Sequence, residues 1–165
     1  MKKMENSKLR SILYSLSFIE GGAVMGAELI SAKMVAPYFG NSLYVWASVL
    51  GITLLSLMLG YFFGGKWSVK STTKERDIYL ILFVAGVWLC LMPSLSSSVL
   101  NFALEMSVAK GVILSLFIFL VPGLILLSMT SPMIISALNK TIETSGSTTG
   151  NIYSSSTLGG ILATF

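Results

Sequence analysis

The chain has 165 residues, of which 54% are hydrophobic and only 11% are charged, and its formal net charge is +4. A soluble domain usually carries about 25% charged residues, so a soluble fold of this composition could not cover its surface with polar groups. The absence of histidine and the single cysteine, Cys90, exclude Ser-His triads, a disulfide within the chain and a thiolate metal cluster, and the composition as a whole indicates an integral membrane protein.

Four apolar segments are long enough to supply the roughly 20 helical residues that a bilayer requires, and they cover about 9–34, 43–65, 78–100 and 111–138. A fifth begins near Gly150 and is still apolar at Phe165. These last residues reach only about 24 Å as a helix, less than the ~30 Å of bilayer hydrocarbon. We expect an all-α, polytopic transmembrane bundle with four full spans and a partial fifth. It would be a single domain over 1–165 that stops inside its fifth helix.

Proline and glycine mark the expected breaks between and within these segments. Pro37 and Gly40 predict the end of the first helix. Pro122 and Gly123 lie inside the fourth segment and should kink it. The run over 145–150 is rich in serine, threonine and glycine, and we interpret it as a flexible connector before the last helix.

The distribution of lysine and arginine predicts the orientation. Of the 11 such residues, all but Lys33 and Lys110 lie in the N-terminal segment, in the loop after the second span or in the loop after the fourth. This bias places the N-terminus in the cytoplasm, in a multi-pass protein of the inner (plasma) membrane. Because the basic residues follow membrane topology, we do not interpret the positive charge as a nucleic-acid site.

Small residues recur at the four-residue spacing that lets helix backbones approach closely in lipid. We interpret them as packing positions rather than as part of a ligand path; they are Gly22 and Gly26, Gly60 and Gly64, and Gly159 and Gly160, each of the last two preceded by a serine four residues earlier.

Two acidic residues lie in the first predicted span. Glu20 falls near the bilayer midplane, where a carboxylate costs about 2.5 kcal/mol or more unless it is protonated, paired or exposed to a wet cavity. Glu28 lies about 12 Å further along the helix axis and about 80° around it. We hypothesise a cation-binding or proton-coupling site bordered by both. The alternative for Glu28 is that it reaches the outer interface or pairs with Lys33.

Sequence motifs of soluble catalysis are missing. There is no P-loop and no GxGxxG motif following a strand. We therefore predict no catalytic residue, no bound metal and no cofactor, and we rank an enzyme acting within the membrane last among the possible functions.

Three stretches occur in order along the chain: ELISAKMVAPYFGNS over 28–42, LGYFFGG over 59–65 and GNIYSSSTLGG over 150–160. Together they resemble the membrane domain of bacterial spermidine-synthase-like proteins, often labelled fused major-facilitator/spermidine synthase. The resemblance covers the first two predicted helices and the last.

This resemblance implies a membrane acidic residue at Glu28 and a basic partner at Lys33, where arginine is usual. It also implies site positions at Tyr153 and Thr157, with Ser156 in place of the usual asparagine. Related chains can carry a soluble aminopropyltransferase domain, whose motifs these residues lack, so we expect no aminopropyl transfer by this chain.

The expected function is the binding or transport of a small cation or polyamine. The alternative is a structural membrane anchor or platform for a separate synthase-like protein. Expected partners are the lipid bilayer and either a second copy of the chain or such a synthase-like protein.

Overall fold

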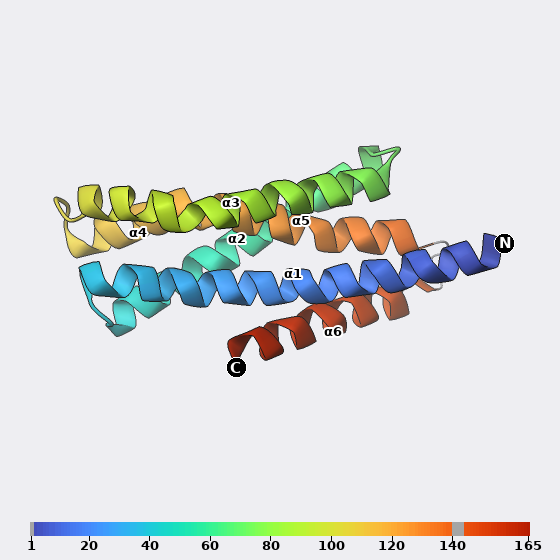
Figure 1. Cartoon of the computed structure of the whole chain (residues 1–165), viewed down its shortest axis with the longest axis horizontal. Coiled ribbons are helices and arrows are strands. Elements are labelled where there is room, and N and C mark those ends of the chain that lie inside the picture. The colour runs from blue at the N-terminus through green and yellow to red at the C-terminus, as the bar shows by residue number, and fades with distance from the viewer. Residues whose placement is uncertain (1, 140–143) are drawn as a thin grey trace.

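In the computed structural model, residues 2–139 and 144–165 are described, with side chains from residue 8 onward. The described residues form helices and no strand, which confirms the all-α prediction (Figure 1). The helices are α1 (Lys2–Phe39), α2 (Leu43–Lys70), α3 (Lys74–Ala103), α4 (Val108–Phe119), α5 (Val121–Leu138) and α6 (Ser145–Thr164).

Four of these helices, α1, α2, α3 and α5, are long and apolar enough to cross a membrane. A helix satisfies its backbone hydrogen bonds internally, which is the requirement that lipid imposes on a spanning segment. Large apolar side chains such as Leu54, Phe62 and Phe83 are more than half exposed on the outside of α2 and α3. Such a surface is suited to contact with lipid rather than with water.

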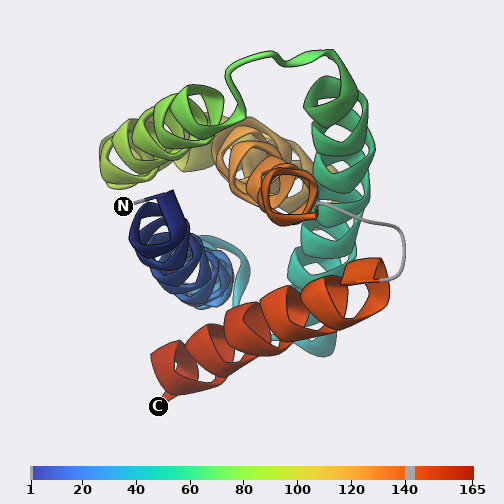
Figure 2. The ribbon, with the colours of Figure 1, turned by 90° about the vertical axis from the view of Figure 1, so that its right-hand side faces the viewer.

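Helix α5 is the centre of the bundle and contacts every other described helix. Viewed end-on, α1, α2 and α3 surround α5, and α6 crosses below α1 (Figure 2). Helices α1 and α6 run in the same direction along the bundle (Figure 1). The N-terminus, the α2–α3 turn and the start of α6 therefore lie at one end of the molecule.

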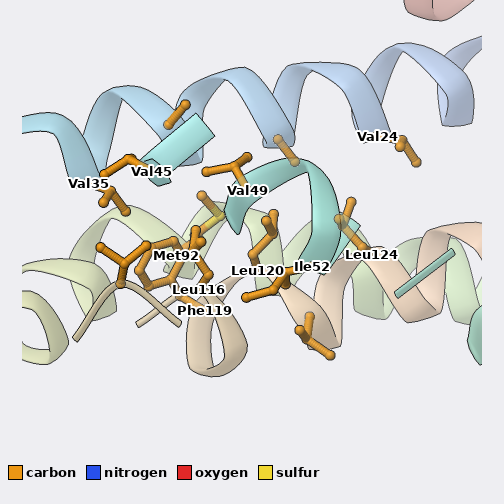
Figure 3. Packing of buried hydrophobic residues seen from close by; sticks show 14 of the residues in the cluster. Val24, Val35, Val45, Val49, Ile52, Met92, Leu116, Phe119, Leu120 and Leu124 are labelled. Atoms are coloured by element: carbon orange, nitrogen blue, oxygen red, sulfur yellow. The ribbon is translucent and has the colours of Figure 1, made fainter. Parts of the chain in front are cut away.

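The larger of two apolar clusters fills the space between α1, α2, α3, α4 and α5 (Figure 3). Val49 of α2 and Phe119 of α4 are completely buried in it, as is Leu124 of α5. A second cluster lies nearer the other end of α5 and contains Leu13, Ile78 and Met133, among others. Helices α1 and α3 contribute to both clusters, so each packs against both ends of α5.

A break at Leu120, next to the kink predicted at Pro122 and Gly123, divides the expected span over 111–138 into α4 and α5. Pro122 lies two residues further on and has no N–H to donate to the carbonyl one turn earlier, so the ladder of hydrogen bonds is interrupted there. Trp88 of α3 donates its indole N–H to the Phe119 carbonyl at 2.9 Å. The break is therefore stabilised by a side chain from a neighbouring helix.

Of two other predicted boundaries, one is confirmed and one is wrong. Helix α1 includes Pro37 and ends at Phe39, directly before Gly40 as predicted, and Gly40 has a φ of 82°, which glycine adopts without strain. The run over 145–150 is not a flexible connector but the start of α6. Thr148 is buried, and Asn139 donates its side-chain N–H to the Ser145 hydroxyl at 3.0 Å, so tertiary contacts hold this polar segment as helix.

Candidate cation site on helix α1

Helices α1 and α6 touch backbone to backbone because both carry glycine at the crossing. A Cβ added at Gly159 would collide with the Phe18 carbonyl, and one added at Gly21 would collide with the Ser156 carbonyl. At Gly22 the nearest atom would be the Gly159 carbonyl oxygen at 3.2 Å. This close approach brings the polar side chains of α6 next to the middle of α1.

The other predicted packing glycines lie in different surroundings. Gly60 and Gly64 place α2 against Ser128 and Met129 of α5, with no room for a Cβ. Gly160 packs against Met25, whose Cγ would lie 2.8 Å from an added Cβ. Gly26 is different, because a Cβ there would meet nothing within 4 Å.

Glu20 lies at this crossing and is only 2% exposed. Ser156 of α6 donates a hydrogen bond to Glu20 Oε2 at 3.1 Å. Ser131 of α5 donates to the same oxygen at 3.3 Å. Three helices therefore meet at one carboxyl group in the interior of the bundle.

A cavity of about 370 Å³ opens beside this carboxyl group. Its polar lining includes Tyr61 of α2 and Thr157 of α6 as well as Glu20 and Ser156. Most of the remaining wall is apolar, formed by Val24, Met25, Leu57, Ile161 and Phe165. The ring of Tyr61 meets that of Tyr153 in an edge-to-face arrangement, with the ring centroids 6.1 Å apart. Two of the predicted residues, Glu20 and Thr157, thus line one cavity, and Tyr153 contacts Tyr61 without lining the cavity itself.

No lysine or arginine forms an ion pair with Glu20 within the described part of the chain. Hydroxyl donors stabilise a carboxylate, but two of them do not replace its hydration shell. The carboxyl group therefore requires either a proton or a cation from outside the protein. The adjoining cavity is where such a cation would lie.

Glu28 and Lys33 do not belong to this arrangement. Glu28 is 7% exposed and lies within interaction range of the Thr53 hydroxyl of α2, but the two do not reach hydrogen-bond geometry. Lys33 is exposed, and no ion pair joins it to Glu28 among the residues that are described. The two glutamates thus border different parts of the interior rather than one cavity.

Sequence reasoning assigned no site role to Tyr61 or Ser131, and it considered Ser156 only for packing and as a replaced asparagine. Tyr61 directly follows a packing glycine, Gly60, which would have indicated that it lies near a helix contact. Ser131 offers no such signal, because only the position of α5 between α1 and α6 brings it to Glu20.

No protein-family model, no curated protein and no solved structure matches this chain. The resemblance to the spermidine-synthase-like membrane domain remains a prediction, and the site must be interpreted from its own geometry.

Proposed function

We propose that the protein is a membrane-embedded module that binds, or binds and transports, a small ammonium cation at Glu20. The observation that carries this proposal is a buried carboxyl group with no cationic partner among the described side chains, next to a cavity. Intramembrane carboxyl groups in such a setting are usually functional.

The lining favours an organic ammonium ion over a bare metal ion. Glu20 is the one acidic side chain in the cavity lining, whereas Ca²⁺ and similar hard cations require six or more oxygen ligands, several of them from carboxylates. An ammonium ion would donate to Glu20, place its alkyl part against the apolar wall and interact with the aromatic ring of Tyr61.

The number of charges favours a monoamine. The cavity offers one carboxyl group, and Glu28 does not line it. A polyamine would bring at least one further ammonium group without a partner there. It remains the second ligand to test, because the sequence resemblance implies it.

We place the protein in the inner membrane with its N-terminus in the cytoplasm. The N-terminal part of α1 and the α2–α3 turn, which carry most of the lysine and arginine residues, lie at the same end of the bundle (Figure 1). This arrangement supports the orientation by the positive-inside rule.

Isothermal titration of the purified protein in nanodiscs with butylammonium chloride tests the proposal. Glu20→Gln should weaken binding by at least about tenfold, because a hydrogen bond to a charged group contributes roughly 1.5–3 kcal/mol. Glu28→Gln is the matched control: it removes a second buried carboxyl group from the same helix and should leave the affinity within about twofold.

Sodium chloride and spermidine, titrated in parallel, define the ligand class. Equal affinities of the Glu20→Gln variant and the wild type for all three cations would overturn the proposal. Tighter binding of sodium than of butylammonium would replace the ammonium ligand with a metal ion.

A further inference from the structure

The turn between α2 and α3 forms a second cavity at the end of the bundle that carries the N-terminus. Its volume is about 660 Å³, and it is separate from the cavity at Glu20. Three basic residues line it, Lys66, Lys70 and Arg76, together with a single acidic residue, Asp77. The lining therefore has an excess of positive charge.

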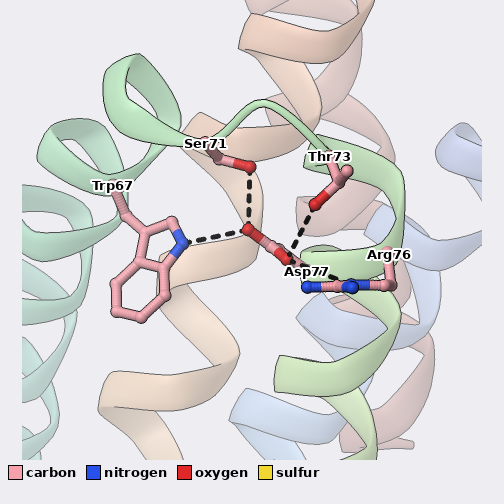
Figure 4. A network of polar contacts seen from close by, with 5 residues as sticks. All are labelled: Trp67, Ser71, Thr73, Arg76 and Asp77. Atoms are coloured by element: carbon pink, nitrogen blue, oxygen red, sulfur yellow. Dashed lines mark hydrogen bonds and ion pairs between the residues drawn. The ribbon is translucent and has the colours of Figure 1, made fainter.

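The Asp77 carboxylate accepts hydrogen bonds that stabilise the turn (Figure 4). Ser71 donates to Asp77 Oδ2 at 2.7 Å, and the indole N–H of Trp67 donates to the same oxygen at 3.1 Å. The Thr73 hydroxyl donates to Oδ1 at 3.5 Å. The carboxylate thus joins the end of α2 to the first turn of α3 and gives the basic residues a defined frame.

The guanidinium group of Arg76 remains accessible. It approaches Asp77 through Nε at 3.8 Å, and its side chain is 77% exposed. Its terminal nitrogens are the groups that bind a phosphate in bidentate fashion. Lys66 and Lys70 are exposed one helical turn apart at the end of α2, on the wall of the same cavity.

The two lysines continue an apolar stripe that runs along the outside of α2. Leu54, Met58 and Phe62 follow one another at four-residue spacing, each more than half exposed, and Lys66 and Lys70 extend the same spacing. The Lys66 ammonium lies 4.1 Å from the centroid of the Phe62 ring. An apolar track therefore leads directly to a basic cavity.

We propose that this cavity binds the phosphate of an anionic phospholipid, whose acyl chain lies along the Leu54–Met58–Phe62 stripe. The combination of a basic headgroup cavity and a continuous exposed apolar track matches both parts of a phospholipid. A free phosphate ion would use only the first part. Basic groups at the membrane surface each favour an anionic lipid by about fivefold.

The experiment measures the affinity of wild-type protein for phosphatidylglycerol with brominated acyl chains, in phosphatidylcholine vesicles, by quenching of tryptophan fluorescence. Brominated phosphatidylcholine gives the non-specific reference. The double substitution Lys70→Gln with Arg76→Gln should weaken phosphatidylglycerol binding by about 30-fold. Lys8→Gln with Arg10→Gln removes the same charge from the same end of the bundle, outside the cavity, and should change the affinity by less than about threefold.

Two further measurements keep the proposal testable if the first variant folds poorly. Lys70→Arg with Arg76→Lys retains the charge and should restore most of the affinity. Excess inorganic phosphate should fail to displace the lipid. Equal losses in the two glutamine variants, or displacement of the lipid by inorganic phosphate, would overturn the assignment of this cavity to a phospholipid.

Discussion

Helix α1 buries two glutamates to a similar extent, but their surroundings differ. Glu20 is 2% exposed and accepts hydrogen bonds from α5 and α6 beside an open cavity. Glu28 is 7% exposed, and the one hydroxyl group beside it, that of Thr53, lies close to the carboxyl group without reaching hydrogen-bond geometry. Burial within a membrane helix does not by itself distinguish the two, whereas the donors and the space around each carboxyl group do.

The difference originates in what packs against each half of α1. Around Glu20, glycine at the α1–α6 crossing lets a serine-bearing helix reach the carboxyl group. Around Glu28 the neighbour is α2, which contributes one hydroxyl group, and the cavity at Glu20 does not extend to Glu28. The polar site at Glu20 thus depends on the close approach of α6 to α1.

The largest expected effect comes from adding one methyl group at the crossing. Gly159→Ala should destabilise the protein by about 3 kcal/mol or more, because the new Cβ would meet the Phe18 carbonyl. Gly26→Ala adds the same methyl group to α1 where a Cβ meets nothing, and it should be neutral or stabilising by up to about 1 kcal/mol. Thermal unfolding in detergent, followed by circular dichroism, compares the two. Similar melting temperatures would show that the α1–α6 contact does not support the fold.

An intermediate effect is expected for the hydroxyl groups of α6. Ser156→Ala should weaken butylammonium binding by roughly tenfold, because the charged carboxylate loses a hydrogen bond. Ser155→Ala removes the neighbouring hydroxyl group, which donates to the Tyr14 carbonyl, and should leave the affinity unchanged. Titration calorimetry distinguishes the two variants. If both lower the affinity equally, Ser156 acts through helix packing and not through Glu20.

The smallest effect is expected next to Glu28. Thr53→Val replaces a buried hydroxyl group that makes no hydrogen bond with a methyl group of similar size. Its unfolding free energy should stay the same or rise by up to about 1 kcal/mol, because a buried hydroxyl group without a partner is less stable there than a methyl group. Chemical denaturation in mixed micelles measures this change. A loss above about 1 kcal/mol would show that the hydroxyl group supports the Glu28 carboxylate and that the two glutamates are less different than their geometry indicates.

Hydrophobic patterning predicted the helical class, and three of the expected spans correspond to α1, α2 and α3. It predicted a kink near Pro122 but not two separate helices, and it failed over 145–150, where the outcome depends on other helices. Trp88 stabilises the break by donating its indole N–H to the Phe119 carbonyl, and Asn139 donates a hydrogen bond to Ser145 in the first turn of α6. Local composition contains neither contact, so the sequence alone shows neither how the break is stabilised nor that 145–150 is helical.

By itself, the sequence determined that this is an all-α protein with four helices apolar enough to cross a membrane, since the length and composition of a segment decide whether it suits lipid. It also identified Glu20 as a carboxyl group whose charge would be unfavourable in the middle of a bilayer. Only the tertiary structure decided that Ser131, Ser156 and Tyr61 surround this carboxyl group while Glu28 lies apart. The physical reason is that donors and cavities come from helices distant in sequence, whose approach depends on the glycine-lined crossing as a whole.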